Sequence, residues 1–178
     1  WSRYYQSLDA VGKLPITINA QGNLTPADVA NIATRWEGKS GLDVIIIDYL
    51  QLMSSGIRSD NRVHEISYIT RALKNLAVSL KVPIILLSQL SRANDKENRA
   101  PKLTDLRDSG SIEQDANTVL LIHRESSLSA DKKIVELTNK TYINVAKQRD
   151  GTCGTVMATF IPSLGYFANY VDENNIPY

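Results

Sequence analysis

Two apolar runs, separated by a longer segment with helical periodicity, dominate the hydrophobic pattern of the chain. Residues 43–48 and 82–87 are rich in isoleucine, leucine and valine without alternation, as are strands covered on both faces in a parallel sheet. Between them, residues 62–80 carry apolar side chains at three- and four-residue intervals, which predicts an amphipathic helix. The order strand, helix, strand indicates an open α/β sheet that is parallel in its centre.

The N-terminal part of the pattern predicts two helices and a short strand. Residues 1–14 have the character of a helix end followed by a turn, and residues 15–18 form a strand candidate. Thr25 and Pro26 mark the start of a second helix that should run to about Trp36 and stop at Gly38. Because the chain opens within a pattern and without an initiator methionine, we expect a fragment of a longer protein.

The C-terminal half predicts three more strands. A buried strand is expected at residues 118–122, and two longer ones are expected at 134–147 and 155–161. The last two are joined through Asp150-Gly151, a dipeptide suited to a hairpin turn. We therefore expect antiparallel pairing at one side of the sheet.

Composition and charge restrict the class of protein. With 178 residues, 43% of them hydrophobic and 22% charged, the chain has the size and composition of one soluble domain. It lacks the run of about 20 apolar residues that a membrane helix needs, and its first residues lack the apolar core of a secretory leader. With a single cysteine, Cys153, a reducing, cytoplasmic compartment is the default expectation. A net charge of +1 neither requires nor excludes a nucleic-acid partner.

The two histidines do not indicate a metal site built from protein ligands. His64 is expected on the polar side of the central helix and His123 at the end of a strand. No cysteine or second histidine stands at the spacing that metal ligands use. Both are therefore interpreted as ordinary surface or edge histidines.

The Gly38-Lys39-Ser40 segment resembles half of a phosphate-binding loop. Such a loop needs a first glycine five positions before the second, and here that position is Ala33. The segment also closes a helix and enters a strand, whereas a phosphate loop follows a strand and opens a helix. A plain helix stop is the better interpretation.

Polar residues follow both central strands at the edge where open α/β sheets bind ligands. Asp48 ends the first apolar run, where its carboxylate is suited to Mg²⁺ and its water shell beside a nucleotide. Gln89 follows the second run, where its amide is suited to sensing a γ-phosphate. From the residues alone, an ordinary turn acid and a strand running into a polar loop explain these two positions about equally well.

Two further segments carry dense polar chemistry. Residues 105–116, DLRDSGSIEQDA, pack small, charged and amide side chains together just before a buried strand, which indicates a polar ligand or solvent. Lys147 and Arg149 stand at alternate positions of a strand end, so their side chains point the same way. They are placed to clamp a phosphate, with a solvated hairpin tip as the alternative.

These segments occur in an order that resembles one family. DYLQLM, LLSQLSR, DLRDSGSIEQDA and AKQRDG are together similar to the C-terminal motor domain of the DnaB-type replicative DNA helicases, which has a RecA-like fold. The similarity runs from about Leu24 to Phe167, and the third segment is its most specific part. The whole chain, residues 1–178, is then the C-terminal portion of a single motor domain.

The resemblance implies roles for the polar residues. Asp48 corresponds to the Walker B acid on Mg²⁺, and Gln89 to the residue that reports the γ-phosphate state to the DNA-binding loops. Arg107, Asp108 and Gly110 fall where this family contacts the backbone of single-stranded DNA without reading sequence. Asp108 departs from the glutamate of many relatives, which leaves a contact made through main-chain N–H groups intact.

The cation pair implies an assembly. Lys147 and Arg149 match the family's pair that reaches across a subunit boundary to the neighbour's nucleotide, with Arg149 as the arginine finger. Such head-to-tail contacts imply a ring of identical subunits, in this family a hexamer. ATP, Mg²⁺ and single-stranded DNA are the ligands that the resemblance implies. It names a primase and a helicase loader as candidate partners, although the sequence itself does not identify them.

The family's Gly-rich phosphate loop and catalytic glutamate precede the matched part. We therefore expect the chain alone to be inactive and its parent to be an ATP-dependent helicase. Two alternatives remain open: a non-catalytic binding or assembly module that kept the fold, and a RecA-like recombinase. The DLRDSGSIEQDA segment argues against the recombinase.

Overall fold

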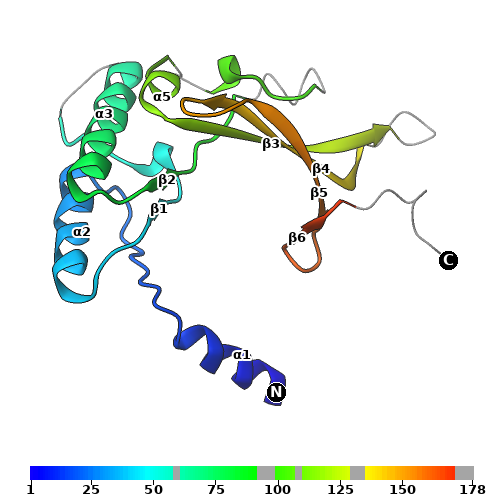
Figure 1. The fold of residues 1–178 in the computed structure, drawn as a ribbon, viewed down its shortest axis with the longest axis horizontal. Helices are drawn as coiled ribbons and strands as arrows, with labels where there is room; N and C mark the ends of the chain where they lie inside the picture. The colour runs from blue at the N-terminus through cyan, green and yellow to red at the C-terminus, as the bar shows by residue number, and fades with distance from the viewer. Residues whose placement is uncertain (58–60, 92–98, 107–109, 129–134, 171–178) are drawn as a thin grey trace.

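The computed structural model describes all residues except 58–60, 92–98, 107–109, 129–134 and 171–178. Two long helices, α2 (Pro26–Ser40) and α3 (Arg62–Leu80), lie side by side against a short parallel sheet of β1 (Ile45–Ile47) and β2 (Ile84–Leu86) (Figure 1). The N-terminal helix α1 (Ser2–Gly12) lies apart from them at the end of an extended segment. The predicted strand, helix, strand order is confirmed, and the central helix has the predicted bounds.

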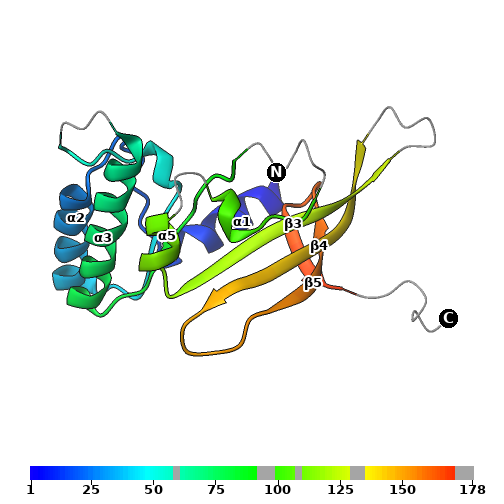
Figure 2. The same cartoon turned by 90° about the horizontal axis from the view of Figure 1, so that it is seen from above.

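A second sheet extends away from the helices (Figure 2). The short helix α5 (Gly110–Asp115) packs against α3 and leads into β3 (Thr118–Leu128). Strands β4 (Val135–Gln148), β5 (Gly154–Ile161) and β6 (Tyr166–Asn169) follow, all antiparallel to their neighbours in the order β3-β4-β5-β6. Single 3-10 turns, η1 (Leu50–Leu52) and η2 (Leu103–Asp105), complete the elements among the described residues. The predicted antiparallel pairing is confirmed, and β6 is an addition to it.

Helix α2 starts where the sequence predicts and ends later. The Thr25 side chain accepts a hydrogen bond from the Asp28 N–H, and the Asp28 carboxylate accepts one from the Thr25 N–H at 2.9 Å, which forms a capping box. The predicted stop at Gly38 is wrong, because the helix continues to Ser40. Gly41, with φ of 79°, adopts the positive φ that terminates it, and its N–H bonds the carbonyl of Glu37.

The core lies between the helices and one face of both sheets. Its buried members include Leu50, Ile66 and Ile69, each 0% exposed. The prediction that the strands are covered on both faces is wrong, because Ile46 and Ile85 on the opposite face are 63% and 52% exposed. Period-2 alternation of a strand sends neighbouring side chains to opposite faces, and in this chain the described helices α2, α3 and α5 pack on only one of them.

The strand predicted at residues 15–18 is absent. This segment is extended between α1 and α2, but no described strand pairs with it, and Ile16 and Ile18 are 64% and 84% exposed. A single extended segment without a neighbour gains no ladder hydrogen bonds, so β-branched composition alone does not make it a strand.

Among the described residues, no helix combines the length and apolar character needed to cross a membrane.

Candidate functional site

The carboxyl ends of the two parallel strands form the first part of the site. Ile47 is paired with Leu86, and the ladder continues beyond the strands because the Leu87 N–H donates to the Ile47 carbonyl at 3.0 Å. Asp48 directly follows β1, and Gln89 lies three residues beyond β2. The structure therefore brings these two predicted residues to the same sheet edge.

The side chains of Asp48 and Gln89 are both exposed at this edge. Among the described residues, no side chain forms an ion pair or hydrogen bond with the Asp48 carboxylate. Mg²⁺ keeps several of its waters and is commonly bound through one or two carboxylates together with substrate phosphates, so a single accessible aspartate fits it. The described part of the chain contains no cluster of three or more metal-ligating side chains. A magnesium ion at this edge would therefore meet one carboxylate of the described residues, Asp48, rather than a complete cage of protein ligands.

Lys147 and Arg149 form the second part of the site, at the C-terminal end of α5. The Lys147 ammonium donates to the carbonyl of Glu113, and the Arg149 guanidinium donates to the carbonyl of Gln114 at 2.7 Å. Cations at this end satisfy carbonyls that have no partner within the helix and oppose the negative end of its dipole. The prediction that the two cations point the same way is confirmed, and their common neighbour in the described chain is α5.

A β-bulge directs Lys147 toward α5. Leu120 is paired with Val145 and Val119 with Lys147, so Ala146 is an extra residue without a partner on β3. Paired residues share a face of the sheet, and Val119 is buried in the core whereas Leu120 is 55% exposed. The bulge therefore puts Lys147 on the core side of the sheet, although Val145, two residues earlier, lies on the open side.

Helix α5 is fastened to α3 by a buried carboxylate. Asp115, at the end of α5, accepts a hydrogen bond of 2.8 Å from the Thr70 hydroxyl and pairs with the Arg71 guanidinium at 3.0 Å. The next turn is held as well, because Lys74 donates to the side chain of Asn117. These contacts give the DLRDSGSIEQDA segment a rigid end, and they show that Asp115 has a structural role that the sequence pattern did not reveal.

The predicted DNA contacts lie at the other end of this segment. Gly110 is the first residue of α5 and is exposed. Arg107 and Asp108 lie outside the described residues, so their predicted contacts stay predictions. Of the DNA-binding trio, the structure thus places Gly110 alone, at the start of the helix whose other end Lys147 and Arg149 contact.

With this geometry in view, the comparison with known families is decisive. The sequence model of the DnaB-like helicase C terminal domain matches residues 1–169 of the chain. The chain belongs to this family. Membership of the DnaB-like helicase C-terminal domain family agrees with the resemblance of the four sequence segments, and it covers more of the chain than they do.

Curated relatives support the same assignment. The replicative DNA helicase DnaB of Geobacillus stearothermophilus is 38% identical over 182 residues, which cover 99% of this chain and 39% of the relative. The replicative DNA helicase DnaB of Leifsonia xyli is 39% identical over 173 residues, covering 97% and 36%. The chain thus spans less than two fifths of the length of these two DnaB relatives.

Solved structures confirm the fold. A structure described as a DnaB-like replicative helicase and its interactions with primase matches with a TM-score of 0.85 at 33% identity, over 96% of this chain and 41% of that chain. A solved structure described as an ATPase domain matches with a TM-score of 0.83 at 34% identity, over 96% of this chain and 60% of that chain. The predicted RecA-like α/β fold of this DnaB-like domain is therefore confirmed.

Asp105, the first residue of the DLRDSGSIEQDA segment, is a structural anchor of the DnaB-like domain. Its carboxylate accepts hydrogen bonds from both terminal nitrogens of Arg99, at 2.7 and 2.9 Å, and from the Lys102 N–H at 2.7 Å. The Arg99 guanidinium, followed by the Lys102 N–H, lowers the pKa of Asp105 from 3.8 to about 2. With 4% of its surface exposed, Asp105 supports the segment from within.

The lowered pKa predicts a pH dependence of stability. A carboxyl group with a depressed pKa stabilises the folded state fully above its unfolded value, and that stabilisation is lost as the pH falls through the folded value. From about pH 4 to about pH 2, wild type should therefore lose stability more steeply than Asp105→Asn. Denaturant titrations at several pH values measure both slopes. Asp150→Asn, at an exposed position, should keep the wild-type slope, and equal slopes for all three proteins would contradict the anchor.

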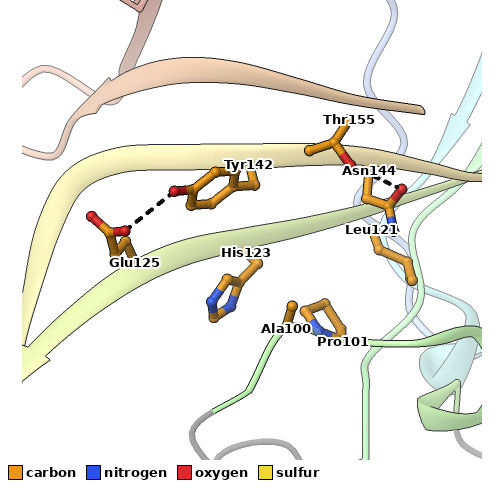
Figure 3. Close-up of a pocket in the computed structure, with 8 residues that line it drawn as sticks. All are labelled: Ala100, Pro101, Leu121, His123, Glu125, Tyr142, Asn144 and Thr155. Carbon is orange, nitrogen blue, oxygen red and sulfur yellow. Dashed lines mark hydrogen bonds between the residues drawn. The ribbon is translucent and has the colours of Figure 1, made fainter. Parts of the chain in front are cut away.

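A cavity of about 340 Å³ lies on the core side of the antiparallel sheet (Figure 3). Its lining includes His123 and Tyr142, whose rings stack 6.5 Å apart, and the Tyr142 hydroxyl donates to Glu125 at 3.2 Å. His123 is therefore within β3 rather than at a strand end as predicted, because β3 extends to Leu128. None of the predicted site residues lines this cavity, so it is separate from the two parts of the site.

Proposed function

We propose that this chain is part of an ATP-dependent, ring-forming replicative DNA helicase that unwinds duplex DNA by translocating on single-stranded DNA. The observation that carries the proposal is the position of Asp48 and Gln89 at one edge of a parallel sheet, in a chain matched along residues 1–169 by a helicase family. DnaB relatives and a solved DnaB-like helicase support it at 33–39% identity.

In the proposed site, Asp48 holds Mg²⁺ through water and Gln89 senses the terminal phosphate of ATP. When bound, Mg²⁺ neutralises charge that develops on the phosphates during transfer. Asp48 contributes a carboxylate with no competing partner among the described residues, and the exposed Gln89 amide offers both a donor and an acceptor. The phosphate cradle itself is supplied from outside these residues, because Gly38-Lys39-Ser40 lies at the end of α2.

The proposed DNA contact uses the start of the DLRDSGSIEQDA segment. Arg107 provides a guanidinium for a phosphate, and the main chain around Asp108 and Gly110 provides N–H donors. Contacts of this kind bind the DNA backbone without reading its sequence, as translocation along any strand requires. The attachment of α5 to α3 through Asp115 and Thr70 supports the role of this segment as a firmly held platform.

Lys147 and Arg149 are proposed to reach the nucleotide of an adjacent subunit. They form no described contact with Asp48 or Gln89 and instead lie together at α5, which supports a role outside the subunit's own nucleotide site. A head-to-tail arrangement either closes into a ring or continues as a filament, and we propose the ring, in the form of a hexamer. A primase and a helicase loader are proposed as partners, the first on the likeness to a structure described with primase interactions.

The test is Mg·ATP hydrolysis by this chain and by its longer parent, each with and without single-stranded DNA. We expect activity, and its stimulation by DNA, only in the parent, because the chain lacks a Gly-x-x-x-x-Gly-Lys-[Ser/Thr] loop. An inactive parent would favour the non-catalytic module. An active parent that assembles as an open filament on DNA would favour the recombinase. Activity in the 178-residue chain would overturn the proposed origin of the phosphate loop.

A further inference from the structure

The side chain of Gln51 joins the segment after β1 to the segment after β2. Its carbonyl oxygen accepts a hydrogen bond from the Gln89 N–H at 3.1 Å. Its amide nitrogen donates to the Ser88 hydroxyl at 3.1 Å and to the Gln89 carbonyl at 3.5 Å. Both ends of one carboxamide are therefore directed at the main chain of Gln89 or at its neighbour.

These contacts extend the parallel sheet beyond its strands. The Leu50 N–H donates to the Leu87 carbonyl at 2.9 Å, and the carboxamide of Gln51 adds the next link. A primary amide has a donor and an acceptor side by side, as a peptide group of a neighbouring strand does. Gln51 thereby substitutes for a strand residue at the point where regular pairing has ended.

The main chain of Gln51 is itself fixed by neighbouring residues. Leu50, which precedes it in η1, is 0% exposed and anchors the turn in the core. The Gln51 carbonyl accepts a hydrogen bond of 3.1 Å from the Arg62 guanidinium, which also pairs with Glu65. Because the backbone on both sides of the side chain is fastened, the carboxamide reaches Gln89 from a fixed origin.

We propose that Gln51 is a positioning residue that fixes the main chain of Gln89 relative to Asp48. This inference rests on the proposed function, in which Gln89 senses the nucleotide phosphate. Gln51 engages the backbone of Gln89 and leaves the Gln89 side chain free of that contact and exposed toward solvent. Gln51 thus does not touch the nucleotide. It fixes the main-chain position from which the Gln89 side chain senses the phosphate.

The first test measures the hydrogen bond itself. Exchange of the Gln89 amide hydrogen, followed by NMR or mass spectrometry in the intact protein, should be about two- to tenfold faster in Gln51→Ala than in wild type. Gln51→Glu keeps an acceptor and should retain more of the protection than Gln51→Ala. The matched control is Gln21→Ala, an exposed glutamine outside the sheet, which should leave the exchange unchanged. Wild-type exchange in Gln51→Ala would overturn the proposal.

The second test measures the consequence for turnover. In the intact protein, Gln51→Ala should reduce the stimulation of hydrolysis by single-stranded DNA about tenfold or more, while the dissociation constant of ATP changes less than twofold. Gln51→Glu should lie between Gln51→Ala and wild type. If Gln51 had only a structural role, its substitution would lower ATP affinity, DNA stimulation of hydrolysis and thermal stability together. If it positions Gln89, the substitution should lower the DNA stimulation and leave the affinity for ATP nearly unchanged.

The two possible failures are distinguishable. If wild type itself shows no DNA-stimulated hydrolysis, the proposed function fails, and all variants share that result. If wild type is stimulated and Gln51→Ala is stimulated equally, the proposed function stands and the positioning role of Gln51 is overturned, even where the amide of Gln89 exchanges faster.

Discussion

Replacing Arg149 by alanine in the intact protein is expected to lower DNA-stimulated turnover by about 10³- to 10⁵-fold. The reason is that a guanidinium supplied in trans stabilises charge on the phosphates in the transition state, an interaction that the bound ground state does not use to the same extent. Nucleotide binding should therefore persist while turnover is lost. Steady-state hydrolysis and equilibrium binding of a fluorescent nucleotide measure the two quantities separately.

A mixing experiment tests whether Arg149 acts across a subunit boundary. Arg149→Ala subunits keep Asp48, and Asp48→Asn subunits keep Arg149, so neither forms a complete site alone. A mixed ring contains boundaries at which Asp48 of one subunit meets Arg149 of the next. Activity should return on mixing if the contact is made in trans, and a mixture as inactive as its components would assign Arg149 to its own subunit's site.

Arg35→Ala is the matched control for the loss of a guanidinium. Arg35 is exposed on α2, away from the hydrogen bonds at the end of α5. Because Arg149 also bonds the Gln114 carbonyl, thermal unfolding of Arg149→Ala must be compared with that of wild type. Turnover equal to that of Arg35→Ala would contradict the finger role, and a large loss of nucleotide binding would reassign Arg149 to ground-state binding.

Replacing Ile69 by alanine is expected to lower the free energy of unfolding by about 2–5 kcal/mol. Ile69 is 0% exposed on α3 and belongs to the cluster that joins α3 to both sheets. The loss combines the transfer free energy of the removed carbons with the cavity they leave, because the surrounding side chains collapse only in part. Denaturant titration of the chain measures it.

Val78→Ala is the control on the same helix. Val78 is 66% exposed, so its truncation removes little buried surface and should change the free energy of unfolding by no more than about 0.5 kcal/mol. Equal effects of the two substitutions would contradict the position of the core on the Ile69 face of α3. A loss confined to Ile69→Ala would support the face assignment on which the attachment of α5 depends.

Local sequence patterns were sufficient to predict several elements of the fold and the position of two candidate site residues. The apolar spacing of residues 62–80 predicted α3 with its observed bounds, because tertiary burial and helical periodicity agree there. The capping signals at Thr25 and Pro26 placed the start of α2, because a helix cap is formed by hydrogen bonds between residues close in sequence. The placement of Asp48 and Gln89 at one edge followed from the rule that parallel strands end together.

Other features depended on neighbours that no local pattern specifies. Isoleucine-rich composition did not make residues 15–18 a strand, and it did not reveal that Ile46 lies on an open face, since both depend on what packs beside them. Asp105 and Asp115 belong to the polar segment 105–116, whose composition indicated a polar ligand or solvent. The structure instead pairs them with Arg99 and with Thr70, residues that only folding brings close.

The candidate site residues were thus named from the sequence, and the tertiary structure decided how those among the described residues are oriented. Lys147 and Arg149 were recognisable as a cation pair, but a bulge at Ala146 directs Lys147 to the core side of the sheet. Gln51 belongs to the DYLQLM segment, but its role could not be predicted from that segment because it consists of hydrogen bonds to the main chain of a distant one. The chemistry of each side chain follows from the residue type alone. The register of paired strands and the hydrogen bonds between distant segments form only when those segments come together in the folded chain.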